Sequence, residues 1–440
     1  MYITDETGDK IIKAVLVGLN TDKSTTEFER SMDELSDLTE ALDIEVATVM
    51  TQNLPNPDSS TYIGSGKVQE IKAALDVFDV DIIIFNDSLS PIQARNLERE
   101  LDTEVMDRTG LILQIFSRRA RTREARIQVE YAQLQYTLPR LAHMNRKLTR
   151  QGGGSGRLSN KGAGEKQLEL DRRHIEHRMT ELRSELKNIE KERDTQRGRR
   201  QRSGMPRVSL VGYTNAGKST LMNRLMKLYG ASGREDKQVL EKDMLFATLD
   251  TSVRSIAPRG KRPFLLADTV GFISQLPHSL IKAFRSTIEE VKYADLILEV
   301  IDISDPEHQW HMEVTRDTFA EIGIVDIPII YVFNKGDILR SEQEKEGRPL
   351  TEIPKIRDDR IYISARDDHC LEVLTDMILK KLSEKHSECV LRLQYPDSAI
   401  LGQLQERGLV RNVEYLAEGI LVTALLDEQD RGRLAEYICS

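Results

Sequence analysis

The stretch that most constrains the fold is a glycine-rich segment in the middle of the chain. Residues 212–219 read G-Y-T-N-A-G-K-S and match the pattern G-x-x-x-x-G-K-[ST]. An apolar run, RVSLV, precedes the segment, and the helix-like stretch LMNRLM follows it. In a strand–loop–helix context the glycines let backbone amides surround a phosphate, and the helix start adds its positive end. The segment therefore predicts a nucleotide-binding α/β domain.

Positions within this segment have distinct expected roles. The ammonium of Lys218 is expected to neutralise the β- and γ-phosphates of a nucleotide, and the hydroxyl of Ser219 to ligate Mg²⁺. The predicted phosphate-binding residues are Gly212, Tyr213, Thr214, Asn215, Ala216, Gly217, Lys218, Ser219 and Thr220.

A second apolar run, residues 264–268, ends in an acid and is soon followed by a glycine. Asp268 suits the strand-end aspartate of a Mg²⁺ shell, and the amide of Gly271 suits a sensor of the γ-phosphate. Between the two motifs, Thr248 offers a second hydroxyl for Mg²⁺, with Thr251 as a nearby competitor. We therefore predict Lys218, Thr248 and Gly271 as catalytic and Ser219 and Thr248 as metal ligands. The further predicted nucleotide contacts are Phe246, Ala247, Thr248, Leu249, Asp250, Asp268, Thr269, Val270 and Gly271.

The identity of the base is indicated by the sequence N-K-G-D at 334–337, after the apolar run IIYVF. The carboxylate of Asp337 can accept both N–H groups of the guanine N1/N2 edge, which adenine lacks. Asn334 can bond to the other edge of the base, and the stem of Lys335 can cover its face. Residues 363–365, I-S-A, follow a further strand. The predicted base-binding set is Asn334, Lys335, Gly336, Asp337, Ser364, Ala365 and Arg366, which points to hydrolysis of GTP to GDP and phosphate.

One expected catalytic side chain is missing. GTPases of the Ras type carry a water-orienting glutamine directly after the switch glycine, and this chain has Phe272 there. We hypothesise slow intrinsic turnover, with the water positioned by another group, by a K⁺ ion near Asn215, or by a partner. Fast hydrolysis by the isolated protein in sodium buffer would contradict this hypothesis.

Alternating strand and helix patterns predict four regions. An N-terminal α/β domain with a small parallel sheet is expected over 1–116, and a helical coiled-coil hairpin over 117–203. A doubly wound P-loop domain is expected over 204–386, and a small α+β domain over 387–440. The overall fold class is α/β.

The helical region has two apolar stripes, at 127–141 and 175–189, each stepping by four and three residues. Between them, six glycines lie from Gly152 to Gly164, which predicts a flexible loop. Pro139 is expected to kink or fray the first helix near its end. The stretch TQRGRRQRSGMP is expected to form a linker.

Charge is strongly segregated along the chain. Residues 117–207 hold 24 Lys and Arg against 11 Asp and Glu, a net +13, so the remainder carries −22 of the total −9. Nineteen of the 24 cations are arginines, the residue best suited to paired contacts with phosphates. A basic centre in an acidic protein indicates a polyanionic partner, although a solvated charged hairpin has the same composition.

Other features exclude several protein classes. The polar N-terminus MYITDETGDK is unlike a signal peptide, and no apolar run is long enough to span a bilayer. Cys370, Cys389 and Cys439 lack paired spacing, which argues against a disulfide framework or zinc site. These features predict a cytoplasmic protein.

The residues collected above resemble the HflX family of ribosome-associated GTPases over nearly the whole chain. Besides residues 212–219, the likeness rests on Y-I-G-S-G-K-V at 62–68, D-R-T-G-L-I-L at 107–113, the run 119–135, and G-E-K-Q-L-E-L-D-R-R at 164–173. The resemblance implies a protein that binds the large ribosomal subunit and its rRNA as a monomer. It also implies that the GTP-bound form separates 70S ribosomes, notably stalled ones, with the glycine loop directed at the peptidyl-transferase centre.

The glycine loop departs from the family pattern G-G-x-G-x-x-G-P-G-E-T-Q-L-E. It is longer by about four residues, with Ala163 at the proline position and Lys166 at the threonine position. The sequence therefore leaves open a housekeeping dissociation factor and a ribosome-protecting, antibiotic-resistance member. A nucleotide-gated RNA-binding assembly scaffold is a further alternative, and an ATP-dependent kinase or ATPase is disfavoured by Asp337.

Overall fold

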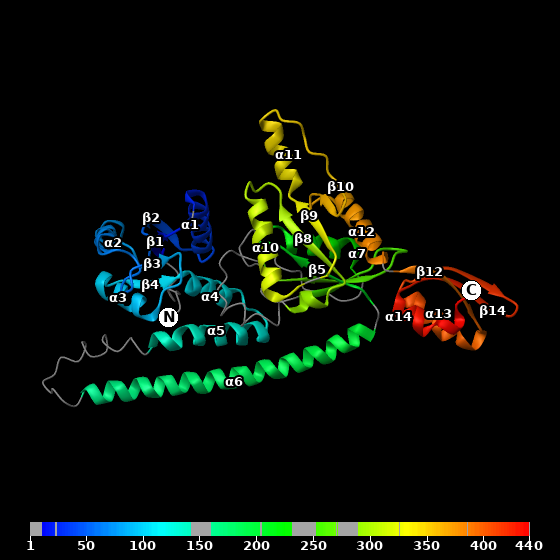
Figure 1. The fold of residues 1–440 in the computed structure, drawn as a ribbon, viewed down its shortest axis with the longest axis horizontal. Coiled ribbons are helices and arrows are strands. Elements are labelled where there is room, and N and C mark those ends of the chain that lie inside the picture. Colours follow the sequence, from blue (N-terminus) through cyan, green and yellow to red (C-terminus); the bar gives the residue numbers. More distant parts are fainter. Residues whose placement is uncertain are drawn as a thin grey trace. The chain divides into compact units, whose positions relative to one another are not determined.

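The computed structural model describes residues 11–22, 24–141, 160–202, 205–230, 252–269, 271, 289–324, 326–384 and 386–439. The described residues form two compact units, 11–191 and 192–439 (Figure 1). Within the described residues, buried apolar clusters surround the sheet of the first unit and each of the two sheets of the second unit. Separate cores of this kind are expected of separate domains.

The N-terminal domain is built on a parallel four-stranded sheet in the order β2-β1-β3-β4. The strands β1 and β3 are almost fully buried because both faces of a parallel sheet are covered. This confirms the predicted small parallel-sheet domain. Its elements are β1 (Lys13–Asn20), α1 (Thr25–Glu40), β2 (Glu45–Asn53), α2 (Ser65–Phe78), β3 (Ile82–Phe85), α3 (Pro91–Leu101), β4 (Glu104–Asp107) and α4 (Arg108–Arg119).

Two helices of this domain begin at side-chain caps that are visible in the sequence. The Ser24 hydroxyl accepts a hydrogen bond from the Glu27 amide, and the Glu27 carboxylate accepts one from the Ser24 amide. Ser90 and Gln93 form the same reciprocal box before α3, with Pro91 at the first helical position. Both caps are local signals that fix the residue at which each helix begins.

The D-R-T-G segment at 107–110 fixes the next helix, α5 (Arg123–Leu141), onto this domain. Asp107 is buried and accepts hydrogen bonds from the amides of Leu89 and Gly110 at 3.0 and 2.9 Å. It also accepts the Tyr136 hydroxyl at 2.8 Å and Arg140 Nη2 at 2.7 Å. Because Tyr136 and Arg140 belong to the last two turns of α5, one carboxylate orients the end of that helix.

The helical hairpin pairs α5 with α6 (Asn160–Arg202). Arg178 donates to Glu130 at 2.6 and 2.9 Å, and Arg123 donates to Glu185 at 2.9 Å. Contact positions rise along one helix as they fall along the other, so the helices are antiparallel. The predicted hairpin is confirmed, and the end of α5 and the start of α6 lie at the same end of it.

The hairpin corrects two predictions. The glycine loop was expected to reach Gly164, but α6 already begins at Asn160. The expected linker TQRGRRQRSGMP is helical as far as Arg202. Glutamate, glutamine, lysine and arginine all favour helix, and this outweighs the cost of isolated glycines at 162, 164 and 198.

The second unit contains a seven-stranded sheet in the order β10-β11-β9-β8-β5-β7-β6, in which β6 and β10 run antiparallel to their neighbours. After β5 the chain continues through α7 to the antiparallel pair of β6 and β7 on one side of β5, and from β8 it continues through α10 to β9 on the other side. Since such crossovers are right-handed, α7 and α10 cover opposite faces of the sheet. The predicted doubly wound domain is confirmed (Figure 1). The elements are β5 (Arg207–Val211), α7 (Lys218–Tyr229), β6 (Ser252–Ile256), β7 (Phe264–Asp268), η1 (Glu289–Tyr293), β8 (Leu296–Asp302), α10 (His308–Ile322), β9 (Ile329–Asn334), α11 (Gly336–Lys345), β10 (Lys355–Arg357), β11 (Arg360–Tyr362) and α12 (Asp368–Ser383).

The sequence pattern around residues 281–291 also predicts a helix. Residues 281–288 lie outside the described part of the chain, and Glu289–Tyr293 forms the 3₁₀ helix η1. The strand β6 was not predicted.

The C-terminal part is a three-stranded antiparallel sheet in the order β12-β14-β13, packed on short helices. Its strands alternate buried and exposed residues, as in a sheet covered on one face. This confirms the small α+β domain. The elements are β12 (Ser387–Leu393), η2 (Tyr395–Asp397), α13 (Ser398–Glu406), β13 (Val410–Leu416), β14 (Gly419–Leu426), α14 (Glu428–Arg433) and η3 (Ala435–Tyr437).

Two further findings concern the whole described chain. No helix within it combines the length and the apolar character needed to cross a membrane. Cys370 and Cys389 are buried free thiols, and Cys439 is exposed. The domain limits 1–116, 117–203, 204–386 and 387–440 stay predictions.

Candidate nucleotide-binding site

The predicted site residues gather at one edge of the seven-stranded sheet. The strands β5, β7, β8 and β9 are parallel, so their carboxyl ends meet at the same edge. The glycine-rich segment follows β5, Asp268 ends β7, and Asn334 ends β9. The strands that follow β5 are added first on one side of it (β7) and then on its other side (β8), and open α/β sheets bind ligands at such a change in strand order.

The glycine-rich segment turns sharply between β5 and α7. Gly212 has φ 136°, and a Cβ atom at this position would lie 2.2 Å from the Val300 carbonyl oxygen. No other residue type fits there, because the conformation and the space both exclude a side chain. The loop therefore passes very close to the backbone of β8 at Val300.

The ammonium of Lys218 is held inside this loop. Lys218 is 6% exposed, and Nζ donates to the carbonyls of Gly212 at 3.0 Å and Tyr213 at 2.6 Å. Burial lowers the pKa of Lys218 to about 8, and the nearby Asp268 carboxylate offsets part of that effect. Because burial destabilises the ammonium of Lys218, an anionic phosphate that binds beside it stabilises the charged form.

This pKa predicts a pH dependence for nucleotide binding. Free protein loses the Lys218 proton above pH 8, whereas bound phosphate favours the ammonium, so binding takes up a proton in that range. We expect the dissociation constant for GTP to rise above pH 8 by up to roughly tenfold per pH unit. Titration calorimetry at pH 7, 8 and 9 measures this rise. Lys218→Arg, which stays protonated, should flatten the profile, and an unchanged profile in that variant would contradict the assignment.

Two oxygen groups beside Lys218 fit a hard divalent cation. Ser219 Oγ donates to Asp268 Oδ2 at 2.9 Å, and Asp268 is fully buried. A hydroxyl and a carboxylate at this distance are donors that Mg²⁺ prefers. Gly271 lies close to the ammonium, since a Cβ there would be 3.1 Å from Lys218 Nζ. The backbone of Gly271 is therefore close to where a terminal phosphate would meet Lys218.

Asn334 links the phosphate loop to the segment 363–365, which follows β11. Its Nδ2 donates to the Ala216 carbonyl at 3.0 Å, and its Oδ1 accepts the Ala365 amide at 2.9 Å. The side chain is buried and both its ends bond to backbone. The expected contact between Asn334 and the second edge of the base stays a prediction.

Three of the predicted base-reading residues line one pocket. Asp337, Ser364 and Arg366 border a cavity of about 460 Å³. Lys335 has φ 62°, and its Nζ forms an ion pair with Asp302 at 2.7 Å. The ion pair holds the end of the Lys335 side chain, and the apolar stem of a lysine is suited to covering a planar ring.

We compared the sequence with models of known protein families. Three family models match consecutive segments. The model described as GTP-binding GTPase N-terminal matches residues 29–117, and GTP-binding GTPase Middle Region matches 119–200. The model described as 50S ribosome-binding GTPase matches 207–335.

Curated relatives match over almost the full length. GTPase HflX of Caldanaerobacter subterraneus subsp. tengcongensis is 39% identical over 97% of this chain and 94% of its own. GTPase HflX of Akkermansia muciniphila is 38% identical over 100% of this chain and 99% of its own. The chain belongs to the GTPase HflX family. Among solved structures, a GTP-binding protein from Sulfolobus solfataricus in complex with GDP is 27% identical, over 85% of this chain and 99% of that one, with a TM-score of 0.40.

Membership of the HflX family confirms the resemblance and the GTPase activity that the motifs predicted. Some predicted site residues of this HflX GTPase lie outside the described residues. These are Phe246, Ala247, Thr248, Leu249, Asp250 and Val270, together with Thr251 and Phe272.

The structure also brings in residues that the sequence interpretation missed. Asp302 ends β8 and pairs with Lys335, and its place at a strand end, like that of Asp268, was the available signal. The ring of Tyr213 stacks on His311 of α10 with centroids 3.9 Å apart, and the only tryptophan, Trp310, lies 5.8 Å from the Tyr213 ring. No local pattern joins Tyr213 to a helix a hundred residues later.

Proposed function

We propose that this HflX GTPase binds the large ribosomal subunit in its GTP form and dissociates stalled 70S ribosomes, with hydrolysis resetting it. The observation that carries the proposal is the antiparallel basic hairpin of α5 and α6, which belongs to the same chain as a guanine-nucleotide site. The match to the family described as 50S ribosome-binding GTPase supports the partner. We further propose that the protein acts as a monomer in the cytoplasm, where ribosomes are found.

In this proposal each site residue has a defined task. Lys218 neutralises the β- and γ-phosphates, and the amide of Gly271 donates a hydrogen bond to the γ-phosphate. The carboxylate of Asp337 selects guanine because it accepts the two N–H groups on the N1/N2 edge of that base. Ser219, which bonds to Asp268, and Thr248 would hold Mg²⁺, and the ion would supply positive charge at the phosphate oxygens. The other predicted contacts from Gly212 to Arg366 surround the same nucleotide.

Phe272 leaves the attacking water without a side-chain partner from that position. We propose a K⁺ ion near Asn215 as one means of positioning the water and stabilising charge. Asn215 is exposed, with φ 60°, in the phosphate loop, so its side chain is accessible from solvent. A comparison of GTP turnover in potassium and sodium buffers tests this, and equal rates would remove the ion from the proposal.

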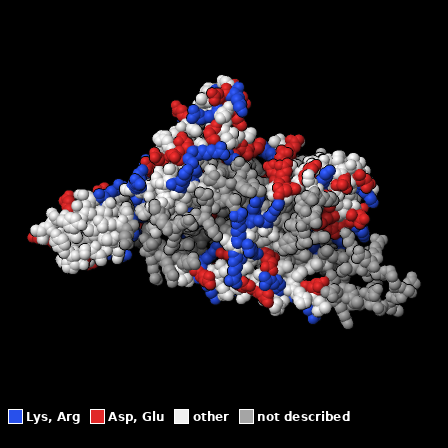
Figure 2. Space-filling view, turned by 180° about the vertical axis from the view of Figure 1, so that it is seen from behind, with Lys and Arg blue, Asp and Glu red and all other residues white. Residues whose placement is uncertain are grey.

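The charge distribution indicates which part meets rRNA. Residues 117–207 carry a net +13, whereas residues 387–440 hold five Arg against nine Asp and Glu, a net −4. Figure 2 shows a face of the C-terminal domain with few Lys and Arg side chains. Because phosphate contacts depend on Lys and Arg, the hairpin is the better rRNA-binding element.

A sucrose-gradient experiment tests the proposed function. Purified 70S ribosomes are incubated with the protein and a non-hydrolysable GTP analogue, and free subunits are measured. Deletion of residues 152–159 removes glycine-loop residues but leaves α6 intact from Asn160. We expect this variant to bind the analogue normally and to release subunits at least roughly tenfold more slowly, since loop contacts worth about 1.4 kcal/mol suffice for that factor.

A second variant replaces residues 152–159 by a glycine–serine segment of equal length. It shows whether splitting depends on the length of the loop or on contacts made by its own side chains. Intact splitting by the deletion variant would show that the loop is only a tether. Binding to the large subunit without any dissociation would favour the RNA-binding scaffold. Protection of peptide synthesis against a peptidyl-transferase inhibitor, without splitting, would favour the resistance function that the longer, basic loop suggests.

A further inference from the structure

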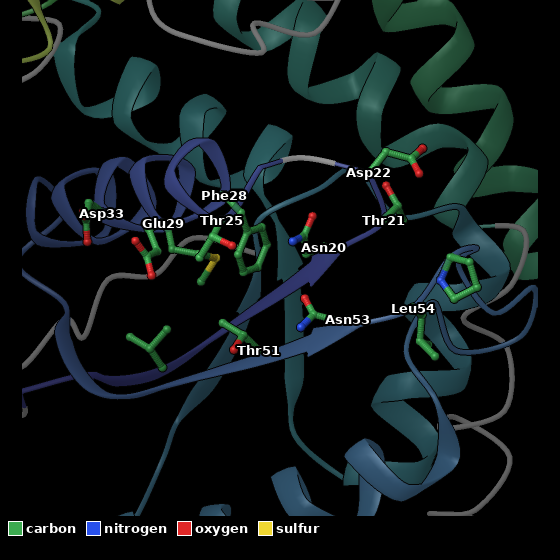
Figure 3. A pocket seen from close by; sticks show the side chains of 13 residues that line it. Asn20, Thr21, Asp22, Thr25, Phe28, Glu29, Asp33, Thr51, Asn53 and Leu54 are labelled. Carbon is green, nitrogen blue, oxygen red and sulfur yellow. The ribbon is translucent and has the colours of Figure 1, made fainter.

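The N-terminal domain contains a groove that the nucleotide site does not use. Its volume is about 820 Å³, and it lies between α1 and the carboxyl half of β2. Figure 3 shows Glu29 and Asp33 on the α1 side and Thr51 and Asn53 on the β2 side. The groove belongs entirely to the first unit.

Close contact between α1 and β1 leaves this groove open over β2. A Cβ atom on Gly18 would lie 2.3 Å from Met32 Sδ and 2.8 Å from Phe28 Cζ, so α1 packs directly against the middle of β1. Phe28 and Met32 are each 6% exposed and form an apolar floor, whereas Val49 on β2 is 49% exposed. The helix therefore covers β1 and leaves β2 partly bare.

The strand β2 is the outermost strand of its sheet, and among the described residues no strand pairs with its outer edge. The Leu54 amide points inward, since it donates to the Asn20 carbonyl at 3.1 Å. Amide direction alternates along a strand, so Asn53, Thr51 and Val49 direct their N–H and C=O groups outward. The side chains of these three residues line the groove. A strand added to this edge would place alternate side chains over the groove.

The wall of the groove is acidic. Asp22, Glu29 and Asp33 line it, and no described Lys or Arg does. None of these three carboxylates forms an ion pair with another residue in the described part of the chain. An RNA backbone would be repelled here, and residues 1–10, with three acids and one lysine, have the wrong charge to fill the groove from within the chain.

We propose that the groove between α1 and β2 binds an extended basic peptide segment of a partner protein, which adds as a strand to the edge of β2. Backbone bonds to Val49, Thr51 and Asn53 provide affinity, and lysine or arginine side chains on alternate residues reach Glu29 and Asp33. The apolar floor accommodates the methylene stems of those side chains. This proposal does not depend on the proposed ribosomal function.

The probe is a fluorescein-labelled nine-residue peptide of alternating lysine and valine, titrated with the full-length protein by fluorescence anisotropy. We expect saturable binding that the double variant Glu29→Gln, Asp33→Asn weakens roughly tenfold, because each exposed ion pair contributes a modest factor. The matched control is Glu40→Gln, Glu45→Gln, which removes two exposed acids of the same helix and strand outside the groove. The control variant should bind within about twofold of the native protein.

Two N-methylated forms of the peptide test the strand geometry. Successive amides of an added strand point alternately toward β2 and away from it. In one form the methyl groups are on the amides that face β2 and block their hydrogen bonds, and in the other form they are on the amides that face solvent. Both forms have the same charge. We expect one form to lose binding and the other to retain it. Absence of binding, equal binding of both forms, or full competition by spermine would overturn the proposal, the last by showing a simple cation site.

Discussion

Replacement of Lys218 by alanine is expected to lower the affinity for GTP and GDP by about 100-fold. The ammonium is buried in the phosphate loop with two carbonyls as partners, and the loop carries no second cation to replace it. Loss of a desolvated charge partner costs about 3 kcal/mol, which corresponds to that factor. Calorimetry with GTP and with GDP in the presence of magnesium measures the change.

The matched control for this prediction is Lys227→Ala. Lys227 lies on the same helix, α7, but is exposed, so its removal should leave both affinities within about twofold. Thermal unfolding of both variants shows whether the fold is kept. Since burial lowers the pKa of Lys218, the ammonium is costly in the nucleotide-free fold, and its loss should not lower the melting temperature greatly. Unchanged GTP affinity in a folded Lys218→Ala variant would contradict the P-loop assignment.

Replacement of Asp337 by asparagine is expected to change the base that the site accepts. The carboxylate can accept the N1–H and the 2-amino group of guanine, whereas an asparagine amide would direct a donor at that amino group. We expect GTP affinity to fall by about 100-fold, because hydrogen bonds to a charged group are worth about 1.5–3 kcal/mol each. Xanthosine triphosphate has a carbonyl at the same place, so its affinity should rise.

Competition between GTP, xanthosine triphosphate and ATP for a fluorescent nucleotide measures this exchange. Glu344→Gln is the control, because Glu344 lines the same cavity from an exposed position on α11. That variant should keep its preference for GTP. A folded Asp337→Asn variant that still prefers GTP to xanthosine triphosphate would show that another group reads the purine.

Several parts of the structure could be predicted because their signals are local. The glycine spacing at 212–219, the apolar strands that end in Asp268 and Asn334, and the N-K-G-D segment each contain their own turn chemistry. These segments follow parallel strands, whose carboxyl ends lie at the same edge of the sheet, so the sequence also predicted that they come together in space. The alternating four and three spacing likewise predicted the antiparallel hairpin.

Other parts could not be predicted because they depend on contacts between distant residues. The length of α6 was underestimated, since glycine at 162, 164 and 198 suggested breaks that the surrounding helix formers overcome. The bonds of Asp107 to Tyr136 and Arg140 join segments about thirty residues apart. The stacking of Tyr213 on His311 likewise has no local signal.

The amino-acid sequence alone determined that this protein is a guanine-nucleotide-binding chain with a basic hairpin. Phosphate binding, base selection and net charge each depend on residues that are close together in the chain. Only the tertiary structure decided that the buried Asn334 bonds to Ala216 and Ala365 and that the ammonium of Lys218 is buried against carbonyls. It also decided that the outer edge of β2 borders an acidic groove. These properties arise from burial and from partners far apart in the chain, which no local pattern contains.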